Sequence, residues 1–117
     1  ELSGILLGKL KKFAEDYLRK KGFKILVKNY RANRYGEIDL IGKDGETLVF
    51  IEVKTRSSKK YGQGNEAINF YKIRSLKRAA NYFLLMNKIK SLCRFDVVSI
   101  LCNKGICQEI HHFRNCF

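Results

Sequence analysis

Two apolar, strand-forming runs joined by a tight turn constrain the fold of this chain more than any other feature. EIDLIG (37–42) and TLVFIEVKT (47–55) flank the turn signal Lys43-Asp44-Gly45-Glu46, and Asp-Gly between such runs is typical of a β-hairpin. Both runs carry apolar residues on both faces, as in Leu48-Val49-Phe50-Ile51, which is the pattern of strands buried inside a covered sheet. The hairpin is therefore expected at the centre of such a sheet.

Helical and strand patterns surround this hairpin. Apolar residues at three- and four-residue steps predict an amphipathic helix that stops at Gly22. The expected elements are a helix over 5–21, strands over 23–31, 37–42 and 47–55, a helix over about 66–87, and strands over 94–102 and 106–113. This order predicts an α/β fold with an αβββαβ core, in which helices flank a mixed five-stranded sheet. A length of 117 residues fits one domain spanning 1–117.

The net charge favours a polyanionic partner. The chain has 24 Lys and Arg against 11 Asp and Glu, a formal charge of +13, and nucleic acid is the leading candidate for such a surface. An acidic protein is the other candidate, whereas a membrane surface is disfavoured because no basic amphipathic helix has an aromatic lipid face. No apolar run approaches the ~20 residues that span a bilayer, and no signal-peptide pattern is found, so a cytoplasmic location is expected.

Four charged residues interrupt the two apolar strands. Glu37 and Asp39 lie in the first, Glu52 and Lys54 in the second, and a charge in a buried strand is costly unless it is compensated. Alternate residues of a strand share a face, so each pair points in one direction. The groups that compensate these charges must therefore lie on the face of the sheet to which the pairs point.

The turn decides whether the two pairs meet. With Asp44-Gly45 as the two-residue turn, Asp39 lies opposite Phe50 and Glu37 lies opposite Glu52. All four charged groups then gather on one face near one end of the sheet. A one-residue bulge would change this register.

Carboxylates held together repel unless they are protonated or bridged by a cation, and oxygen ligands suit Mg²⁺ or Mn²⁺. Asp39, Glu52 and Glu37 are the candidate metal ligands. Lys54 beside them can orient a water for in-line attack on a phosphodiester. The alternative is that these are edge-strand charges paired among themselves, such as Glu52 with Lys54 or Lys28. Five of the eleven acidic residues fall between positions 37 and 52, which favours a metal site.

Several segments together resemble one known family. GEIDLI, VFIEVKTR and RFDVV, with AEDYLRKKGFKILVKNYR near the start and IHHFRNCF at the end, are similar to the YraN-type family of small bacterial proteins. The fold of that family resembles archaeal Holliday-junction resolvases and restriction endonucleases. The resemblance runs from about Leu10 to the end of the chain.

The resemblance implies a PD-(D/E)xK nuclease domain, with Asp39 and Glu52 as metal ligands and Lys54 as the catalytic lysine. The implied activity is that of a Mg²⁺- or Mn²⁺-dependent endodeoxyribonuclease, structure-specific on branched DNA. Resolvase-like enzymes tend to act as dimers because a junction presents two symmetric strands, so a homodimer is compatible with this function. The alternative is a non-catalytic nucleic-acid-binding protein on a degenerate nuclease scaffold.

One position departs from the family pattern. Members tend to carry a Gly-Glu pair in the first helix, and the glutamate position is Lys11 in this sequence. Related nucleases use such a helix glutamate as an extra acid at the metal site, so its loss implies a weaker or single-metal site. Glu15, one turn further along the same helix face, is the candidate replacement; the alternative is a solvated helix residue.

Basic residues near the motif are candidate contacts to nucleic acid: Arg31, Arg34, Arg56 and Lys72. A guanidinium group at the end of a strand can bind a phosphate with two hydrogen bonds. Each of these residues is otherwise a solvated surface charge. Gln63, in a loop with two glycines, is a further candidate.

Residues near the C-terminus have structural interpretations. Asp96 is expected to pair with a base such as Arg94. His111 and His112 are expected to be packed or solvated, because neither has a carboxylate partner in sequence that suggests general base work. Cys102, Cys107, His111 and Cys116 have the spacing C-x4-C-x3-H-x4-C, which differs from a zinc knuckle in its first gap. The favoured interpretation is a hairpin that brings Cys102 close to Cys107, and zinc is the alternative.

Overall fold

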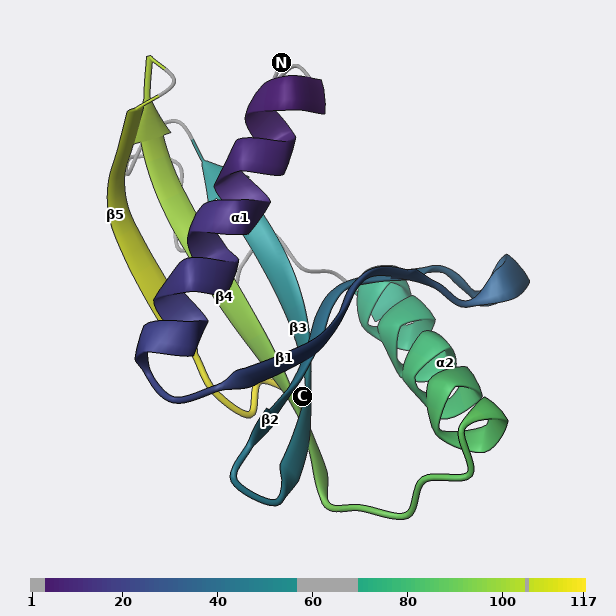
Figure 1. The fold of residues 1–117 in the computed structure, drawn as a ribbon. Helices are drawn as coiled ribbons and strands as arrows, with labels where there is room; N and C mark the ends of the chain where they lie inside the picture. Colours follow the sequence, from purple (N-terminus) through teal and green to yellow (C-terminus); the bar gives the residue numbers. More distant parts are fainter. Residues whose placement is uncertain (1–3, 57–69, 105) are drawn as a thin grey trace.

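Five strands form one mixed sheet with a helix on each face (Figure 1). The computed structural model describes residues 4–56, 70–104 and 106–117. Its elements are α1 (Gly4–Lys20), β1 (Lys24–Arg31), the 3-10 helix η1 (Asn33–Tyr35), β2 (Glu37–Asp44), β3 (Thr47–Arg56), α2 (Phe70–Met86), β4 (Cys93–Asn103) and β5 (Ile106–Phe113). The predicted α/β fold with a five-stranded mixed sheet is confirmed and is consistent with a restriction-endonuclease-like core.

The strands follow the order β1-β2-β3-β4-β5 across the sheet. All neighbours are antiparallel except β3 and β4, which are parallel. A parallel pair needs a long crossover connection, and α2 lies within it. The predicted hairpin forms β2 and β3, which are two of the three interior strands of the sheet.

Each helix covers its own apolar cluster. On one face, Leu10, Ala14 and Leu18 of α1 pack with Val49 and Ile51 of β3. On the other face, the buried residues of α2 are Leu76, Ala79, Ala80 and Phe83, and they pack with Leu48 and Phe50 of β3. Strand alternation in β3 divides its side chains between the two clusters, and this explains why the run is apolar on both faces.

The register of the central hairpin differs from the prediction by two residues. Asp44 pairs with Thr47 and Ile41 pairs with Phe50, so the turn residues are Gly45 and Glu46. Gly45 takes a φ of 63°, as in hairpin turns with glycine at the first central position. The predicted Asp39–Phe50 and Glu37–Glu52 pairings are therefore wrong, and the register continued by one step places Asp39 opposite Glu52.

Alternation along β2 is interrupted at Asp39. Ile38 packs in the cluster under α2, whereas Leu40, two residues later, packs in the cluster under α1. The neighbouring strand is irregular at the same level, because Asn29 of β1 has a φ of 51°. Figure 1 shows the β1–β2 ribbon turning here and extending away from the sheet toward η1 and α2. The bend leaves Asp39 at the point where the ribbon crosses from one helix to the other.

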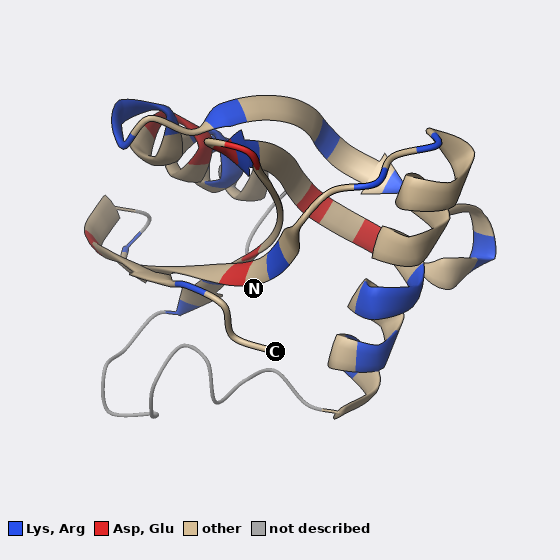
Figure 2. Cartoon of the chain, turned by 90° about the horizontal axis from the view of Figure 1, so that it is seen from below, with Lys and Arg blue, Asp and Glu red and all other residues tan. Residues whose placement is uncertain are grey.

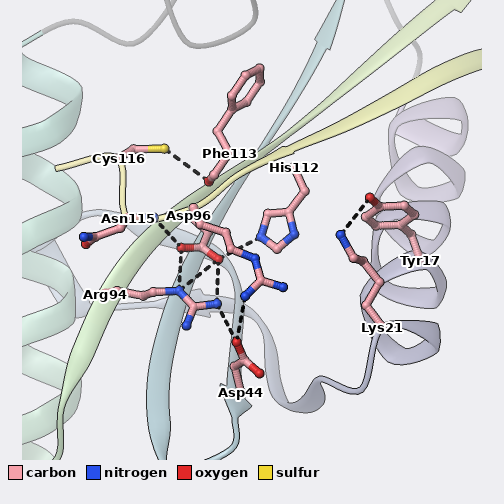
Figure 3. A network of polar contacts seen from close by, with 10 residues as sticks. Tyr17, Lys21, Asp44, Arg94, Asp96, His112, Phe113, Asn115 and Cys116 are labelled. Carbon is pink, nitrogen blue, oxygen red and sulfur yellow. Dashed lines mark hydrogen bonds and ion pairs between the residues drawn. The ribbon is translucent and has the colours of Figure 1, made fainter.

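A buried polar network fixes the C-terminal segment (Figure 3). The Asp96 side chain is fully buried and accepts hydrogen bonds from Arg94 Nε at 3.0 Å and from the Asn115 N–H at 3.0 Å, and His112 Nε2 lies 2.8 Å from its other oxygen. Arg94 also donates to Asp44 beside the hairpin turn at 2.8 Å. The predicted pairing of Asp96 with Arg94 is confirmed, so this acid has a structural role.

The prediction of packed or solvated histidines is confirmed, because the His112 side chain is 2% exposed and that of His111 is 53% exposed, and each has a carboxylate partner. His112 pairs with Asp96, and His111 Nε2 lies 2.9 Å from Glu109. Cys102 pairs with Cys107 across the β4–β5 hairpin, as the favoured interpretation required. Cys116 lies at the other end of these strands, where its N–H donates to the Phe95 carbonyl at 2.7 Å. No group of three His, Cys, Asp or Glu residues suited to a metal is found in the described part of the chain.

None of the helices in the described segments is long and apolar enough to cross a membrane. The first residues predicted for the second helix, 66–69, and the candidate Gln63 lie outside the described residues.

Candidate metal and nucleic-acid site

The main feature of the candidate site is a pair of carboxyl groups on the neighbouring interior strands β2 and β3. Asp39 comes from the bend in β2 and Glu52 from β3, and their side chains are only 16% and 8% exposed. The Val53 N–H donates to Asp39 Oδ2 at 2.8 Å, which fixes the Asp39 side chain against β3. The structure therefore brings together two of the three acids for which the sequence predicted metal binding.

A lysine from each helix contacts this acidic pair. Lys11 Nζ of α1 lies 3.2 Å from Asp39 Oδ1, and Lys72 Nζ of α2 lies 3.2 Å from Glu52 Oε2. The bend in β2 makes this possible, since it turns Asp39 toward α1 while Glu52 remains directed at α2. The pair thus connects elements on opposite faces of the sheet.

Glu52 holds its proton more tightly than an ordinary glutamate. Desolvation by burial raises its pKa to about 7, and the charge of Asp39 and a hydrogen bond with that residue act in the same direction. Lys72 opposes this rise without cancelling it. Two neighbouring carboxyl groups in a partly desolvated site therefore resist being ionised together.

Lys54 lies two residues beyond Glu52 in β3, and strand alternation places it on the same face. It pairs in register with Ser99 of β4. Ser99 is 1% exposed, and its hydroxyl has no hydrogen-bond partner among the described residues. Lys54 likewise forms no ion pair with a described carboxylate, so its ammonium group is not neutralised by the acidic pair.

The structure does not bring Glu37 into this pair. Its carboxylate forms an ion pair with Arg31 at 2.7 Å across the β1–β2 ladder and is half exposed. Glu15 is also held elsewhere, by Arg19 Nη2 at 2.8 Å and by Lys28 Nζ at 3.6 Å. A hydrogen bond from Arg19 lowers the Glu15 pKa, although burial acts in the opposite direction. Neither acid therefore adds a third carboxylate to Asp39 and Glu52.

The predicted basic contacts are distributed over several elements. Arg31 is paired with Glu37, Lys72 with Glu52, and Arg56 ends β3 beside Leu101 of β4. Figure 2 shows further Lys and Arg residues in blue along α1 and α2, with far fewer acids in red. The two helices that contact the acidic pair thus carry more basic than acidic residues.

Arg34 lies in a concave region that the sequence motifs did not reveal. A cavity of about 360 Å³ between η1 and α2 is lined by Arg34, Tyr35, Tyr71, Arg74, Ser75 and Arg78. A second cavity of about 490 Å³ shares Arg34, Tyr35 and Arg78 with the first and continues along α2. The basic face of α2 was visible in the sequence, but its apposition to Tyr35 depends on the bend in β2.

The comparisons with known proteins agree with the sequence motifs. Residues 11–100 match the family model described as uncharacterised protein family UPF0102. A UPF0102 protein of Caldicellulosiruptor saccharolyticus is 45% identical over 106 residues, which cover 89% of each chain. A UPF0102 protein of Thermodesulfovibrio yellowstonii is 44% identical over 117 residues, or 99% of each chain. The chain therefore belongs to the uncharacterised protein family UPF0102, the YraN-type family that its motifs resemble.

Proposed function

We propose that this protein is a metal-dependent endodeoxyribonuclease that cleaves phosphodiester bonds, with branched DNA as its preferred substrate. The observation that carries the proposal is the meeting of Asp39 and Glu52 on the neighbouring strands β2 and β3, with Lys54 on the same strand face as Glu52. Two carboxylates and a lysine in a strongly basic domain are the groups needed to hold a divalent cation and a phosphodiester together.

Asp39 and Glu52 fit a divalent cation by their chemistry. Both are oxygen donors, both are shielded from solvent, and burial, with the charge of Asp39 acting in the same direction, raises the Glu52 pKa. Mg²⁺ or Mn²⁺, when bound, would lower the pKa of a water and offset charge that develops on the phosphate oxygens. A cation would also offset the repulsion between the two carboxylates, which is the reason why this pair would accept one.

The protein's own residues would position the substrate. The ammonium group of Lys54 is free of carboxylate partners among the described residues and is suited to orient the attacking water or to contact the scissile phosphate. Lys72 would exchange its contact with Glu52 for a phosphate oxygen of the DNA. Arg31, Arg34 and Arg56 would bind phosphates further along the strand.

A second candidate function is non-catalytic binding of nucleic acid, and Lys11 is the observation that favours it. Its ammonium group lies 3.2 Å from Asp39, and it supplies from within the chain part of the positive charge that a metal would otherwise provide. A protein in which Lys11 keeps Asp39 occupied would bind DNA without cleaving it.

Cleavage assays distinguish the two functions. Single-stranded, duplex, flap and four-way DNA would be incubated with Mn²⁺ or with EDTA, and with wild-type protein or Lys54→Ala. The nuclease proposal predicts product only with metal and wild-type protein, most of it from the branched substrates. Binding without product under every metal condition would establish the second function and exclude the first.

A further inference from the structure

An open groove runs along α2 where the β1–β2 ribbon packs against it. The two cavities that form it have volumes of about 360 and 490 Å³, within the range of small-molecule sites. They share Arg34, Tyr35 and Arg78, and their α2 residues extend from Tyr71 to Leu85. At 1.5 Å per helical residue the groove follows the helix for about 20 Å.

The groove has a fixed wall on the side of η1. Ser75 donates a hydrogen bond to the Tyr35 carbonyl at 3.0 Å, and Gly36 lies so close that a Cβ at this position would collide with the Ser75 hydroxyl. Gly36 also has a φ of 126°, which side chains other than glycine rarely adopt. The position of Tyr35 over α2 is therefore set by backbone packing.

Three guanidinium groups give the groove its charge. Arg34, Arg74 and Arg78 line it, and none of them forms an ion pair with a carboxylate in the described segments. Most other arginines of the described chain have such a partner, as Arg19 and Arg31 do. The groove is therefore an uncompensated positive region suited to phosphates.

Aromatic rings lie between these charges. The Tyr35 and Tyr82 rings are 5.6 Å apart, and Arg34 lies over the Tyr35 ring at 5.3 Å. Tyr71 lines the same groove and is 77% exposed, which is unusual for so large a ring in a folded domain. Rings interleaved with arginines form the kind of surface on which unpaired bases stack while their phosphates are neutralised.

We propose that the groove between η1 and α2 binds an unpaired nucleotide of a single-stranded nucleic acid, with its base stacked on Tyr71 and its phosphates held by Arg74 and Arg78. Tyr71 immediately precedes Lys72 in α2, and Lys72 contacts Glu52, so this end of the groove lies one residue along the helix from a contact to the acidic pair. Within the proposed function, the groove would select flaps and junctions because they offer unpaired nucleotides. The binding step itself requires neither metal nor cleavage.

Binding of a labelled oligothymidylate in EDTA, followed by fluorescence anisotropy, tests this site. The matched probe is an oligomer of the same length with abasic sugars, which keeps the phosphates and lacks the bases. The protein variants are Tyr71→Ala, Tyr71→Phe and Arg78→Ala. Lys77→Ala is the control, because it removes one exposed charge from the same helix at a position that does not line the groove.

Tyr71→Ala is expected to weaken oligothymidylate binding about tenfold, the effect of losing one stacked base, and to leave binding of the abasic probe unchanged. Tyr71→Phe should retain binding. Arg78→Ala should weaken binding of both probes. It should also reduce the slope of log K against log[salt] by about 0.7, the contribution of one phosphate contact on a single strand. Both effects should be larger than those of Lys77→Ala. Equal losses for Tyr71→Ala on both probes, or equal affinity for oligothymidylate, blunt duplex and polyglutamate, would overturn the inference.

The outcome is separable from that of the nuclease proposal. Loss of cleavage in Lys54→Ala with Tyr71-dependent binding intact supports both proposals. If the wild-type protein shows Tyr71-dependent binding but no cleavage, the groove proposal is supported and the nuclease proposal is contradicted. If cleavage depends on metal but Tyr71→Ala has no effect on binding, the nuclease proposal is supported and the groove proposal is contradicted.

Discussion

Lys11 and Asp39 form an ion pair, with 3.2 Å between Nζ and Oδ1, that links α1 to the bend in the central hairpin. Lys11 also donates to the Asn29 side chain at 3.0 Å, so it contacts both strands of the β1–β2 ribbon at the level where alternation breaks. The position at which this sequence departs from its family pattern therefore makes a direct contact with a proposed metal ligand.

Replacement of Lys11 by glutamate tests this relationship. Lys11→Glu removes the ion pair and places a third carboxylate beside Asp39, so the metal-free protein should lose about 1 kcal/mol or more of stability. With Mn²⁺ the same variant should gain more in melting temperature than wild type does, because a third oxygen ligand strengthens cation binding. Thermal melts with and without Mn²⁺ measure both effects.

Lys12→Glu is the control for that experiment. Lys12 neighbours Lys11 in sequence and pairs with the exposed Asp16, so this variant makes the same change in charge away from Asp39. Equal Mn²⁺ shifts in Lys11→Glu and Lys12→Glu would mean that Asp39 is not part of a cation site.

Stability should decrease between about pH 4.5 and pH 7 because of Glu52. Its pKa is raised from 4.5 to about 7 by burial and by Asp39, so over this interval the folded protein binds more protons at Glu52 than the unfolded chain does. The free energy of unfolding then falls as the pH rises, by on the order of 2–3 kcal/mol, and levels off above pH 7. Urea titrations of wild type and Glu52→Gln across this range measure the effect.

Glu52→Gln cannot titrate at this position, so its stability curve should be flatter over the same interval. It should also be the more stable protein at pH 8, since it avoids a second buried charge beside Asp39. Parallel curves for the two proteins would show that Glu52 titrates at an ordinary pKa.

The pattern of apolar and polar residues along the chain was sufficient to predict the fold. Strands with apolar residues on both faces must be covered on both sides of the sheet, and the helical periodicities predicted the two helices that cover them. Val49 and Phe50 of β3 accordingly lie in different clusters, one under each helix. The turn was less predictable, because Asp44-Gly45 and Gly45-Glu46 are both acceptable two-residue turns. An error of two residues preserves which face each β3 side chain occupies, so Glu52 and Lys54 still share a face.

The details of the site depend on the bend at Asp39, which no periodicity in the sequence predicts. Alternation predicted that Glu37 and Asp39 act together, whereas the bend turns Asp39 toward Lys11 and leaves Glu37 with Arg31. The same bend brings Tyr35 over α2 and creates the groove. Asn29, at the level of Asp39, has a positive φ, but asparagine tolerates that conformation without requiring it.

Truncation of Asp96 should destabilise the protein strongly without involving the proposed site. Asp96→Ala leaves Arg94 and His112 without their buried partner, at a cost of about 3–5 kcal/mol. Burial by itself raises the Asp96 pKa, but hydrogen bonds from His112, Arg94 and the Asn115 N–H outweigh it and hold the pKa below its ordinary value. This contribution to stability is present above the ordinary pKa of aspartate and is lost as the pH falls through the lowered one.

Asp16→Ala is the matched control for Asp96→Ala. Asp16 forms an exposed pair with Lys12, and its removal should change stability by less than about 0.5 kcal/mol. Denaturant titration measures both values. Similar midpoints for Asp96→Ala and Asp16→Ala would show that the C-terminal network contributes little.

The η1 wall of the groove is tested by Gly36→Ala. A Cβ there meets the Ser75 hydroxyl and requires a φ that alanine rarely adopts, so a loss of about 1–3 kcal/mol is expected. Gly36→Ala combined with Ser75→Ala removes the collision but not the backbone strain, and it should recover only part of the loss. Full stability of the single variant in denaturant titration would mean that the loop is not held against α2.

The nuclease proposal requires that Asp39, Glu52 and Lys54 act as one metal-dependent cleavage site. Cleavage of flap and four-way DNA in Mn²⁺ tests this with Asp39→Asn, Glu52→Gln and Lys54→Ala, each beside wild type and the exposed-surface variant Lys88→Ala. Product is expected from wild type and Lys88→Ala, none is expected in EDTA, and each site variant should lose at least a hundredfold in cleavage, while all bind DNA in EDTA. Undiminished cleavage by the three site variants, or cleavage that persists in EDTA, would contradict the proposal.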